Sequence, residues 1–307
     1  MIKKILIAGQ EGMVGNSLYI FLKKKRYKII DCKRSDLDFT NQRDVDAWFD
    51  RNKPEIVINA AGKVGGILDN NNFKEEYLYI NSMIGLNLVS ASFRNNVNKF
   101  INLGSACIYP RLTKNPIKEE YILNSKLEKT NEAYAIAKIA VLKYCEYIMD
   151  KFKKEYFSLQ PANLYGGNDN YNLESSHVIP ALIRKFAYAK KYKKKTIEIW
   201  GSGLIKREFL HVDDLTNAIF FCLKNKVKTS IINIGSGEEI SIKKLAFEIK
   251  KISQFKGNLV FNKKFPDGVK KRRLESSKII KMGWKPKINL KNGLLKTYNY
   301  FSKNYQY

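Results

Sequence analysis

Three glycines near the N-terminus constrain the possible folds more than any other feature of the chain. Gly9, Gly12 and Gly15 follow an apolar run at residues 3–8 and precede a helical pattern that extends to about Lys24. Strand, glycine turn and helix in this order open a βαβ unit, because residues without a Cβ let the backbone approach a pyrophosphate at the helix N-terminus. The spacing predicts a dinucleotide-binding site, whose residues in this turn are Gly9, Gly12, Met13, Val14 and Gly15.

The remaining chain alternates between apolar strands and amphipathic helices, as in a parallel sheet with helices on both faces. The alternation loosens after residue 165, where Gly, Asn and Asp cluster. We therefore expect an α/β protein with a Rossmann-type doubly wound sheet in residues 1–165, to which 209–235 return, and a smaller α/β substrate domain in 166–208 and 236–307. The expected strands are 27–31, 56–60, 100–103, 156–160 and 231–234. The expected helices are 42–52, 75–93, the segment from Tyr134 to 153, 176–188, 213–224, 242–252 and 290–302.

The end of the second strand bears on the choice of cofactor. Asp31 would bind the ribose hydroxyls of NAD, whereas Lys33 and Arg34 would bind the 2′-phosphate of NADP. In a chain with 56 Lys and Arg against 29 Asp and Glu, these two basic residues are equally explained as solvated surface charges. The sequence favours NADP (NADPH) and leaves NAD open.

The net charge of +27 raises the question of a nucleic-acid partner. The lysines are spread over almost every predicted helix instead of forming one stripe, so we attribute the charge to composition and expect no nucleic-acid partner. No apolar run reaches the length of a membrane span, and the start lacks the apolar core and cleavage site of a signal peptide. The four cysteines form no C-x-x-C pair, which fits a reduced compartment. We expect a cytoplasmic enzyme that uses neither a membrane nor a metal.

Tyr134 and Lys138 are four residues apart and so share one face of a predicted helix. An ammonium beside a phenol favours its ionisation and lowers a pKa that is otherwise about 10. Ser105 follows the strand at 100–103 and can hold a substrate carbonyl against that phenol. These groups suit an enzyme that moves a proton to or from a carbonyl or alcohol oxygen while a hydride moves at carbon. Because Tyr-x-x-x-Lys occurs by chance in many helices, its weight depends on its surroundings.

Longer strings that fit one known enzyme family cover nearly the whole chain. They are residues 9–15, Asn59-Ala60-Ala61, 61–67, Gly104-Ser105, 107–110, 130–138, Pro161-Ala162-Asn163, 163–166, 176–182, 200–203 and 207–214. Because it carries these strings, the chain resembles the extended short-chain dehydrogenase/reductases. Among them it is most similar to the GDP-L-fucose synthase family of GDP-4-keto-6-deoxymannose 3,5-epimerase/4-reductases.

The resemblance implies NADPH-dependent reduction at C4 of a GDP-4-keto-6-deoxy sugar, with epimerisation at C3 and C5, in nucleotide-sugar biosynthesis for surface glycans. Tyr134 would donate the proton, Ser105 and Lys138 would complete the reductase triad, and Cys107 and His177 would be the epimerisation acid/base pair. Taken alone, Cys107 fits a small buried hydrophobe and His177 a polar helix-start residue. The family would bind the GDP-sugar with Ser105, Ala106, Cys107, Asn163, His177, Lys185, Trp200 and Arg207. It would bind the cofactor also with Asn59, Ala60, Ala61, Tyr134, Lys138, Asn163 and Leu164. We also expect a homodimer.

Three departures from the family pattern bear on these expectations. Glu11 stands where a basic residue commonly lies near the adenosine phosphate, and Ala106 replaces a second Ser beside the sugar. Glu275-Ser276 replaces a more usual Leu-Asp. These departures leave open a C4 reductase that acts on a GDP-4-keto-heptose without epimerisation. Two further alternatives also stay open: an NAD-retaining nucleotide-sugar epimerase or dehydratase, and a non-catalytic dinucleotide-binding protein.

Overall fold

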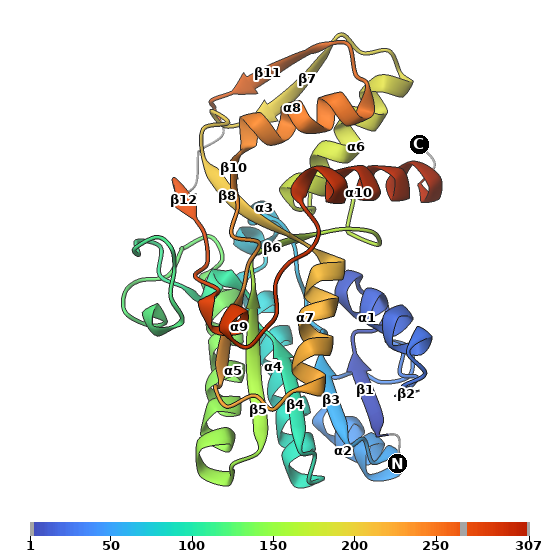
Figure 1. The fold of residues 1–307 in the computed structure, drawn as a ribbon, viewed down its shortest axis with the longest axis vertical. Coiled ribbons are helices and arrows are strands. Elements are labelled where there is room, and N and C mark those ends of the chain that lie inside the picture. Colours follow the sequence, from blue (N-terminus) through green and yellow to red (C-terminus); the bar gives the residue numbers. More distant parts are fainter. Residues whose placement is uncertain (1–2, 265–268, 306–307) are drawn as a thin grey trace.

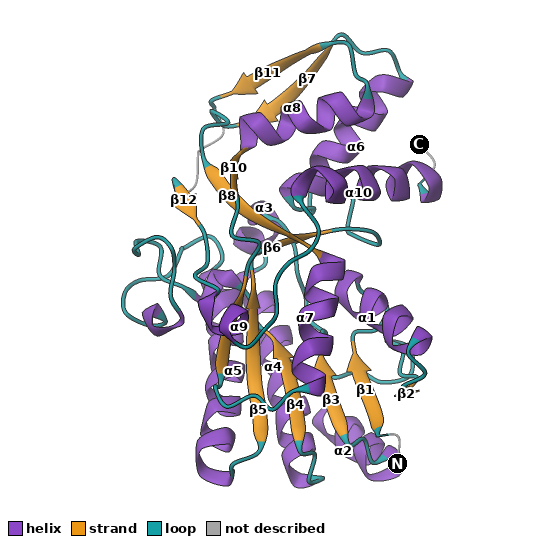
Figure 2. Ribbon diagram, viewed as in Figure 1, coloured by secondary structure: helices purple, strands orange, loops and turns teal. Residues whose placement is uncertain are grey.

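A six-stranded parallel sheet forms the larger part of the computed structural model, which describes residues 3–264 and 269–305 (Figures 1 and 2). The strand order is β2-β1-β3-β4-β5-β9, and every neighbouring pair is parallel. The carboxyl ends of the strands therefore meet at one edge, where doubly wound folds bind their ligands. The strands are β1 (Lys4–Ala8), β2 (Lys28–Ile30), β3 (Ile56–Asn59), β4 (Lys99–Leu103), β5 (Glu155–Pro161) and β9 (Ile231–Ile234).

Helices cover both faces of this sheet (Figure 2). On one face lie α1 (Met13–Lys24) and α7 (Val212–Lys224), and on the other lie α2 (Gln42–Asn52), α4 (Lys74–Arg94) and α5 (Glu132–Phe152). Successive residues of a strand point to opposite faces. Ile5 and Ile7 of β1 therefore lie in one core, and Leu6 and Ala8 lie in the other. Because both faces are buried, the strands are continuous apolar runs.

The close packing of α4 on α5 depends on a glycine. A Cβ on Gly85 of α4 would lie 2.2 Å from Cγ2 of Val141 on α5. A larger residue at position 85 would push the two helices apart, because such a contact is far below van der Waals distance. The glycine thereby sets how deeply α5, which carries Tyr134 and Lys138, sits against the rest of the domain.

The upper part of the molecule in Figure 1 consists of short strands and three long helices. β8 (Lys206–His211) pairs with β6 (Asn163–Tyr165), β10 (Glu239–Ser241) and β12 (Lys271–Arg272), and β7 (Thr196–Trp200) pairs with β11 (Asn258–Asn262). The helices α6 (Val178–Lys191), α8 (Ile242–Ser253) and α10 (Leu290–Asn304) contribute to a third core. Around α9 (Ser277–Lys281), Ile279 and Trp284 pack instead in the core that contains β9. Short helices at α3 (Ile67–Asn72), η1 (Ala106–Ile108) and η2 (Glu119–Tyr121) interrupt the loops.

The structure confirms the expected α/β class with a Rossmann-type parallel sheet. The helices expected at 42–52 and 213–224 are present, and their observed ends agree within one residue. The division of the chain into two domains at 165, 208 and 235 stays a prediction. Within residues 3–264 and 269–305, no helix combines the length and apolar character needed to span a membrane.

Candidate active site

The glycine-rich turn connects the carboxyl end of β1 to the start of α1 (Figure 1). Gly9 has a φ of +81°, a conformation that residues with side chains rarely adopt, and a Cβ there would lie 2.8 Å from the backbone of Ala60. A Cβ on Gly15 would lie 2.0 Å from Gly9 O. These two glycines therefore allow α1 to begin directly against β1 and β3.

Gly12 has a different role in the turn. It immediately precedes Met13, the first residue of α1, and no side chain caps this helix. A Cβ on Gly12 would contact only Gly9 O, at 3.5 Å, so a side chain there would project into the space before the first N–H groups of α1. Those donors and the positive end of the helix suit a pyrophosphate. The turn thus fits a dinucleotide, which the backbone of Gly12, Met13 and Val14 would hold.

The segment after β3 borders the same turn. Asn59 is only 2% exposed, and its Nδ2 donates to Asn102 Oδ1 at 3.0 Å while its Oδ1 accepts from Ala61 N at 3.2 Å. Both polar atoms of the Asn59 side chain are therefore hydrogen-bonded within the protein. The half-buried backbone of Ala60 and Ala61, held against Gly9, is the part of this segment that faces the dinucleotide site.

Lys33 and Arg34 are exposed in the loop after β2. Arg34 N donates to the carboxylate of Glu11 at 2.9 Å, which places the loop beside the glycine turn. The carboxylate of Asp31 instead accepts a hydrogen bond from the hydroxyl of Tyr19 on α1 at 2.7 Å. The loop that would recognise the adenosine end of the cofactor is thus next to the turn, with two cations and the carboxylates of Asp31, Asp36 and Asp38 in it.

Ser105, Tyr134 and Lys138 meet at the carboxyl end of β4. The Ser105 hydroxyl accepts a hydrogen bond from Cys107 N at 3.1 Å and forms another with the phenol of Tyr134. Lys138 Nζ lies 5.6 Å from the centre of the Tyr134 ring and donates to Leu103 O at 3.0 Å. The structure therefore brings the three predicted residues of the triad together.

Burial dominates the pKa of Tyr134. It raises this pKa above the usual value of 10.0, the nearby Cys107 acts in the same direction, and the hydrogen bond with Ser105 acts in the opposite one. The expected net lowering of the phenol's pKa is not observed, because burial outweighs the contributions that lower it. Burial also disfavours the ammonium and lowers the pKa of Lys138 to about 8. The phenol of Tyr134 is therefore held protonated, which is the form that a proton donor needs.

Cys107 and His177 come from different parts of the chain. Cys107 lies half-buried in η1, close enough to Tyr134 to affect its pKa. The segment before α6 reaches the loop after β3, where Gly66 N donates to Ser175 O at 2.7 Å. His177 follows this contact. Its side chain is exposed, yet surrounding protein lowers the pKa of its imidazole, a combination typical of the wall of a concave surface. Neutral imidazole can accept a proton.

Two residues predicted to bind the nucleotide lie together in the upper part of the molecule. Lys185 Nζ of α6 is 5.0 Å from the centre of the Trp200 ring and donates to Glu198 O at 3.1 Å. Trp200, at the end of β7, is 43% exposed, so its ring is accessible for stacking on a base. Lys185 and Trp200 thus combine a cation and an aromatic face at one place.

The β6–β8 pair connects this region to the triad. Asn163 and Leu164 lie on β6, directly after β5, and Asn163 Nδ2 donates to Glu208 O on β8 at 2.9 Å. Arg207 on β8 is the register partner of Arg272 on β12. Arg272 Nη2 in turn donates to Ala106 O at 3.0 Å, next to Ser105. Sequence reasoning did not assign Arg272 a place at the site.

Gln160 of β5 is a second residue that sequence reasoning missed. Its Oε1 accepts a hydrogen bond from Ser105 N at 2.7 Å, and its side chain is fully buried. A Cβ on Gly104 would lie 2.0 Å from this Oε1, so glycine at position 104 makes room for the amide. Gln160 therefore fixes the backbone that carries the Ser105 hydroxyl. One signal in the sequence could have found it. Gln160 is a polar residue in an otherwise apolar strand, and this strand pairs with the one that ends before Gly104.

Asn81 of α4 is a third such residue. Its Nδ2 donates to Lys63 O at 3.0 Å and to Tyr77 O at 2.8 Å, whereas its Oδ1 is buried without a partner among the described residues. A Cβ on Gly62 would lie 2.6 Å from Asn81 Oδ1 and 3.5 Å from Lys138 Nζ. The amide oxygen and the ammonium thus flank the same point, and Asn81 belongs to the surroundings of the triad.

A glycine turn at the edge of a Rossmann sheet, with Ser105, Tyr134 and Lys138 nearby, defines a dinucleotide-dependent enzyme. The chain belongs to the NAD dependent epimerase/dehydratase family, whose model matches residues 5–235. It is 43% identical over 302 residues to a GDP-L-fucose synthase from Sinorhizobium fredii (strain NBRC 101917 / NGR234), a match that covers 98% of this chain and 96% of that relative. The predicted similarity to GDP-L-fucose synthases and the enzyme class are thereby confirmed.

Two solved structures from Campylobacter jejuni match over the same length. A GDP-mannoheptose C4 reductase with NADP bound is 36% identical, with a TM-score of 0.90 and coverage of 98% of both chains. A GDP-6-OMe-4-keto-L-xylo-heptose reductase is 34% identical, with a TM-score of 0.92 and coverage of 99% of this chain and 98% of that one. These matches support the Rossmann-type fold and extend the similarity to heptose reductases.

Replacing Gln160 with Met should lower the turnover number for NADPH-dependent carbonyl reduction by about tenfold or more. Methionine fills the space but leaves Ser105 N without its acceptor, and an unsatisfied buried donor costs about 1–3 kcal/mol. The KM for the dinucleotide should change little, because Gln160 bonds to Ser105 N and not to the glycine turn. Steady-state kinetics measure both quantities, and Gln42→Met, at the exposed start of α2, is the matched control. Unchanged turnover in Gln160→Met would contradict this positioning role.

Proposed function

We propose that this protein catalyses the NADPH-dependent reduction at C4 of a GDP-4-keto-6-deoxy sugar, coupled to epimerisation at C3 and C5, in nucleotide-sugar biosynthesis for surface glycans. The observation that carries the proposal is the meeting of Ser105, Tyr134 and Lys138 at the carboxyl edge of the sheet, the edge to which the glycine turn also belongs. A relative named GDP-L-fucose synthase with 43% identity along nearly the whole chain supports the choice of substrate.

In the proposed reduction, the bound nicotinamide supplies a hydride to C4. Tyr134 donates its proton to O4, and its raised pKa ensures that the proton is present at neutral pH. The Ser105 hydroxyl holds O4 against the phenol. Ser105 and Lys138 then stabilise the phenolate that remains, because a hydrogen bond and a nearby ammonium both favour the charged form. The backbone hydrogen bond from Lys138 to Leu103 O keeps the ammonium at this position.

Epimerisation is assigned to Cys107 and His177. The C4 ketone acidifies the C–H groups at C3 and C5, so a base can remove a proton to give an enolate and an acid can return one to the opposite face. The lowered pKa of His177 keeps its imidazole neutral and able to accept a proton, and the Cys107 thiol can donate one. Epimerisation must precede reduction, because reduction removes the carbonyl that acidifies these positions.

The nucleotide end of the substrate is assigned to the upper part of the molecule. The exposed ring of Trp200 would stack on guanine, and Arg207 and Lys185 would pair with the diphosphate. Lys185 keeps a positive charge but offers no planar fork, so its contact with phosphate would be less directional than that of an arginine. Asn163 and Leu164 of β6 would line the path from the diphosphate to the sugar.

A C4 reductase that acts on a GDP-4-keto-heptose without epimerisation is the second candidate. Ala106 at the position of a sugar-contacting Ser removes a hydrogen bond and makes room for a larger sugar. Two solved heptose reductases, 36% and 34% identical to this chain, support this candidate. The two candidates share the Ser105, Tyr134 and Lys138 chemistry and differ in the use of Cys107 and His177.

The proposed cofactor is NADPH, the proposed assembly a homodimer and the proposed location the cytoplasm. The cations Lys33 and Arg34 beside the turn support a cofactor that has a 2′-phosphate. The NADP bound in a solved relative supports the same choice. The helices α4 and α5, which pack on one another, carry exposed apolar side chains that a second copy would cover. These side chains are Leu78, Tyr79, Ile136, Tyr147 and Phe152. The free thiols of all four cysteines suit a reducing compartment.

Tyr134→Phe should lower the turnover number for reduction by about 10²–10⁴-fold, because general acid catalysis contributes an effect of this size. Binding of NADPH should remain, since the ring and Lys138 stay in place. Tyr192→Phe, at the exposed end of α6 and outside the proposed dimer face, should retain wild-type turnover. Steady-state NADPH oxidation with a GDP-4-keto sugar measures the effect. A Tyr134→Phe turnover number within a few-fold of wild type would contradict the assignment of the triad.

Changing Lys33 and Arg34 together to Ala should raise the KM for NADPH by about tenfold or more, equivalent to about 1.4 kcal/mol of lost phosphate binding. The KM for NADH should hardly change, because NADH has no 2′-phosphate. The double variant Lys24→Ala, Lys25→Ala removes two exposed cations from the end of α1 and serves as the control. Equal effects on both cofactors would identify Lys33 and Arg34 as surface charges.

Epimerisation predicts solvent exchange. In D₂O without NADPH, the wild-type protein should place deuterium at C3 and C5 of a GDP-4-keto-6-deoxy sugar, and NMR of the product detects it. Cys107→Ser should lose this exchange but still reduce a ketone that already has the final configuration, because Tyr134 and Lys138 are unchanged. Turnover of NADPH by the wild type with no deuterium at C3 or C5 would favour the heptose-type reductase and remove the epimerase half of the proposal.

A further inference from the structure

Glu11 stands between the glycine turn and the loop after β2, the two segments that border the pyrophosphate and the adenosine ribose of a dinucleotide in a Rossmann fold. It directly precedes Gly12, and one oxygen of its exposed carboxylate, Oε2, accepts from Arg34 N at 2.9 Å. The other oxygen, Oε1, has no hydrogen-bond or ion-pair partner among residues 3–264 and 269–305. A ligand at this place therefore meets an accessible acceptor that carries a negative charge.

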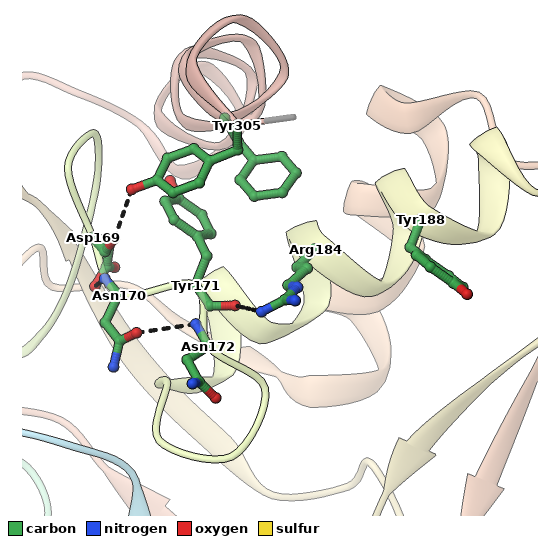
Figure 3. A pocket seen from close by; sticks show the side chains of 8 residues that line it. Asp169, Asn170, Tyr171, Asn172, Arg184, Tyr188 and Tyr305 are labelled. Carbon is green, nitrogen blue, oxygen red and sulfur yellow. Dashed lines mark hydrogen bonds between the residues drawn. The ribbon is translucent and has the colours of Figure 1, made fainter. Parts of the chain in front are cut away.

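The backbone of Glu11 is held from another side by the loop after β6. Asn168 Nδ2 donates to Glu11 O at 2.9 Å. The residues that follow Asn168 are anchored at the end of α10, as Figure 3 shows: the Tyr305 hydroxyl donates to Asp169 O at 3.4 Å, and the rings of Tyr171 and Tyr305 lie 4.8 Å apart. Contacts on two sides thus fix the position from which the Glu11 side chain reaches the adenosine end of the site.

The carboxylate of Asp31, which the sequence assigns to the ribose hydroxyls, is held elsewhere. Its Oδ1 accepts from the Tyr19 hydroxyl at 2.7 Å and lies 3.9 Å from Lys23 Nζ, so both contacts draw the carboxylate toward α1. Asp36 has both oxygens engaged, one by Lys33 N at 2.9 Å and one by the hydroxyl of its neighbour Ser35 at 3.2 Å. Glu11, by contrast, combines a carboxylate oxygen without a partner with a position in the glycine turn.

Acids also offset the two cations of the loop. The pKa of Asp38 is lowered, chiefly by hydrogen bonds from the N–H and the hydroxyl of Thr40 and to a smaller extent by the charge of Arg34, so Asp38 is ionised at neutral pH. A 2′-phosphate is attracted by Lys33 and Arg34 but repelled by these carboxylates. A ribose hydroxyl is uncharged and can donate a hydrogen bond to a carboxylate. The charges around Glu11 therefore favour a phosphate less than the two cations alone would.

We propose that Glu11 is a specificity-determining residue that accepts a ribose hydroxyl of the adenosine moiety and opposes a 2′-phosphate, so that the protein takes NAD(H) as well as NADP(H). The inference rests on the dinucleotide site of the proposed function and concerns which cofactor that site accepts. In Rossmann folds the acid that binds this ribose usually lies about 20 residues after the glycine turn. Here the acid comes from the turn itself.

Titration of NAD⁺ and NADP⁺ into the full chain, followed by isothermal calorimetry, tests this assignment without any turnover. The wild type should bind the two cofactors with affinities within about tenfold of each other. Glu11→Gln keeps the length of the side chain and an oxygen that can accept from Arg34 N, but it removes the charge. NAD⁺ should bind about threefold or more weakly to this variant, because a charged acceptor forms the stronger hydrogen bond. NADP⁺ should bind about threefold or more tightly, because the repulsion is lost.

The opposite signs separate recognition from a structural role, because a damaged turn would weaken the binding of both cofactors. Asp31→Asn should change each affinity by less than about twofold, since screening limits the effect of a charge that does not touch the ligand. Asp50→Asn, which removes an exposed carboxylate near the end of α2, is the charge-matched control. Thermal melting checks that each variant folds, and Glu11→Ala, at the same exposed position, should repeat the two opposite shifts.

A wild type that binds NADP⁺ more than about tenfold tighter than NAD⁺ would overturn the proposal. Parallel shifts of both affinities in Glu11→Gln and Glu11→Ala, unchanged affinities in both variants, or a loss of NAD⁺ binding in Asp31→Asn would do the same. These results leave the proposed reduction intact, since they report which cofactor binds and not what is reduced. Absence of binding by either cofactor would instead overturn the dinucleotide site of the proposed function, and this proposal with it.

Discussion

A ladder of three buried polar side chains fixes the strand register on which the whole site depends. Asn59 Nδ2 donates to Asn102 Oδ1, and Asn102 Nδ2 donates to Ser158 Oγ, both at 3.0 Å across β3, β4 and β5. These residues are register partners in the sheet. A slip of one residue would turn a polar side chain to the opposite face and leave its partner unsatisfied in the core. The ladder therefore fixes how far the carboxyl ends of the strands extend, and with them Ala60 and Ser105.

The surroundings of Tyr134 keep its phenol protonated at neutral pH. Buried surroundings raise the phenol's pKa and keep its proton available, while the same burial lowers the pKa of Lys138 to about 8. A donor must hold its proton before the step and tolerate its loss afterwards. Ser105 supplies the hydrogen bond that makes the loss tolerable, and Gln160 keeps Ser105 in place. The pKa of this phenol thus reflects burial and Cys107, which raise it, and Ser105, which lowers it.

Local patterns predicted most of the sheet, because period, glycine spacing and helix start signals act within a few residues. The glycine turn, the helix with Tyr134 and Lys138, and the strand before Ser105 were all predicted in this way. Gln160, Asn81 and Arg272 were not, because their roles arise from contacts between elements distant in sequence. The direction of the pKa shift of Tyr134 was also missed, since a four-residue spacing gives charge proximity but not burial. The short strands β6, β10 and β12 carry too few residues for a periodic signal.

Transfer of deuterium from NADPH labelled at C4 of the nicotinamide ring tests the central claim most directly. The protein is incubated with GDP-4-keto-6-deoxymannose, or with a GDP-4-keto-heptose, and with each of the two stereospecifically deuterated cofactors. The account predicts that one labelled cofactor, and not the other, places deuterium at C4 of the GDP-sugar, with one NADPH oxidised per product. Conversion of the sugar without net NADPH oxidation, as in an NAD-retaining epimerase, or NADPH oxidation with no label at C4, would contradict it.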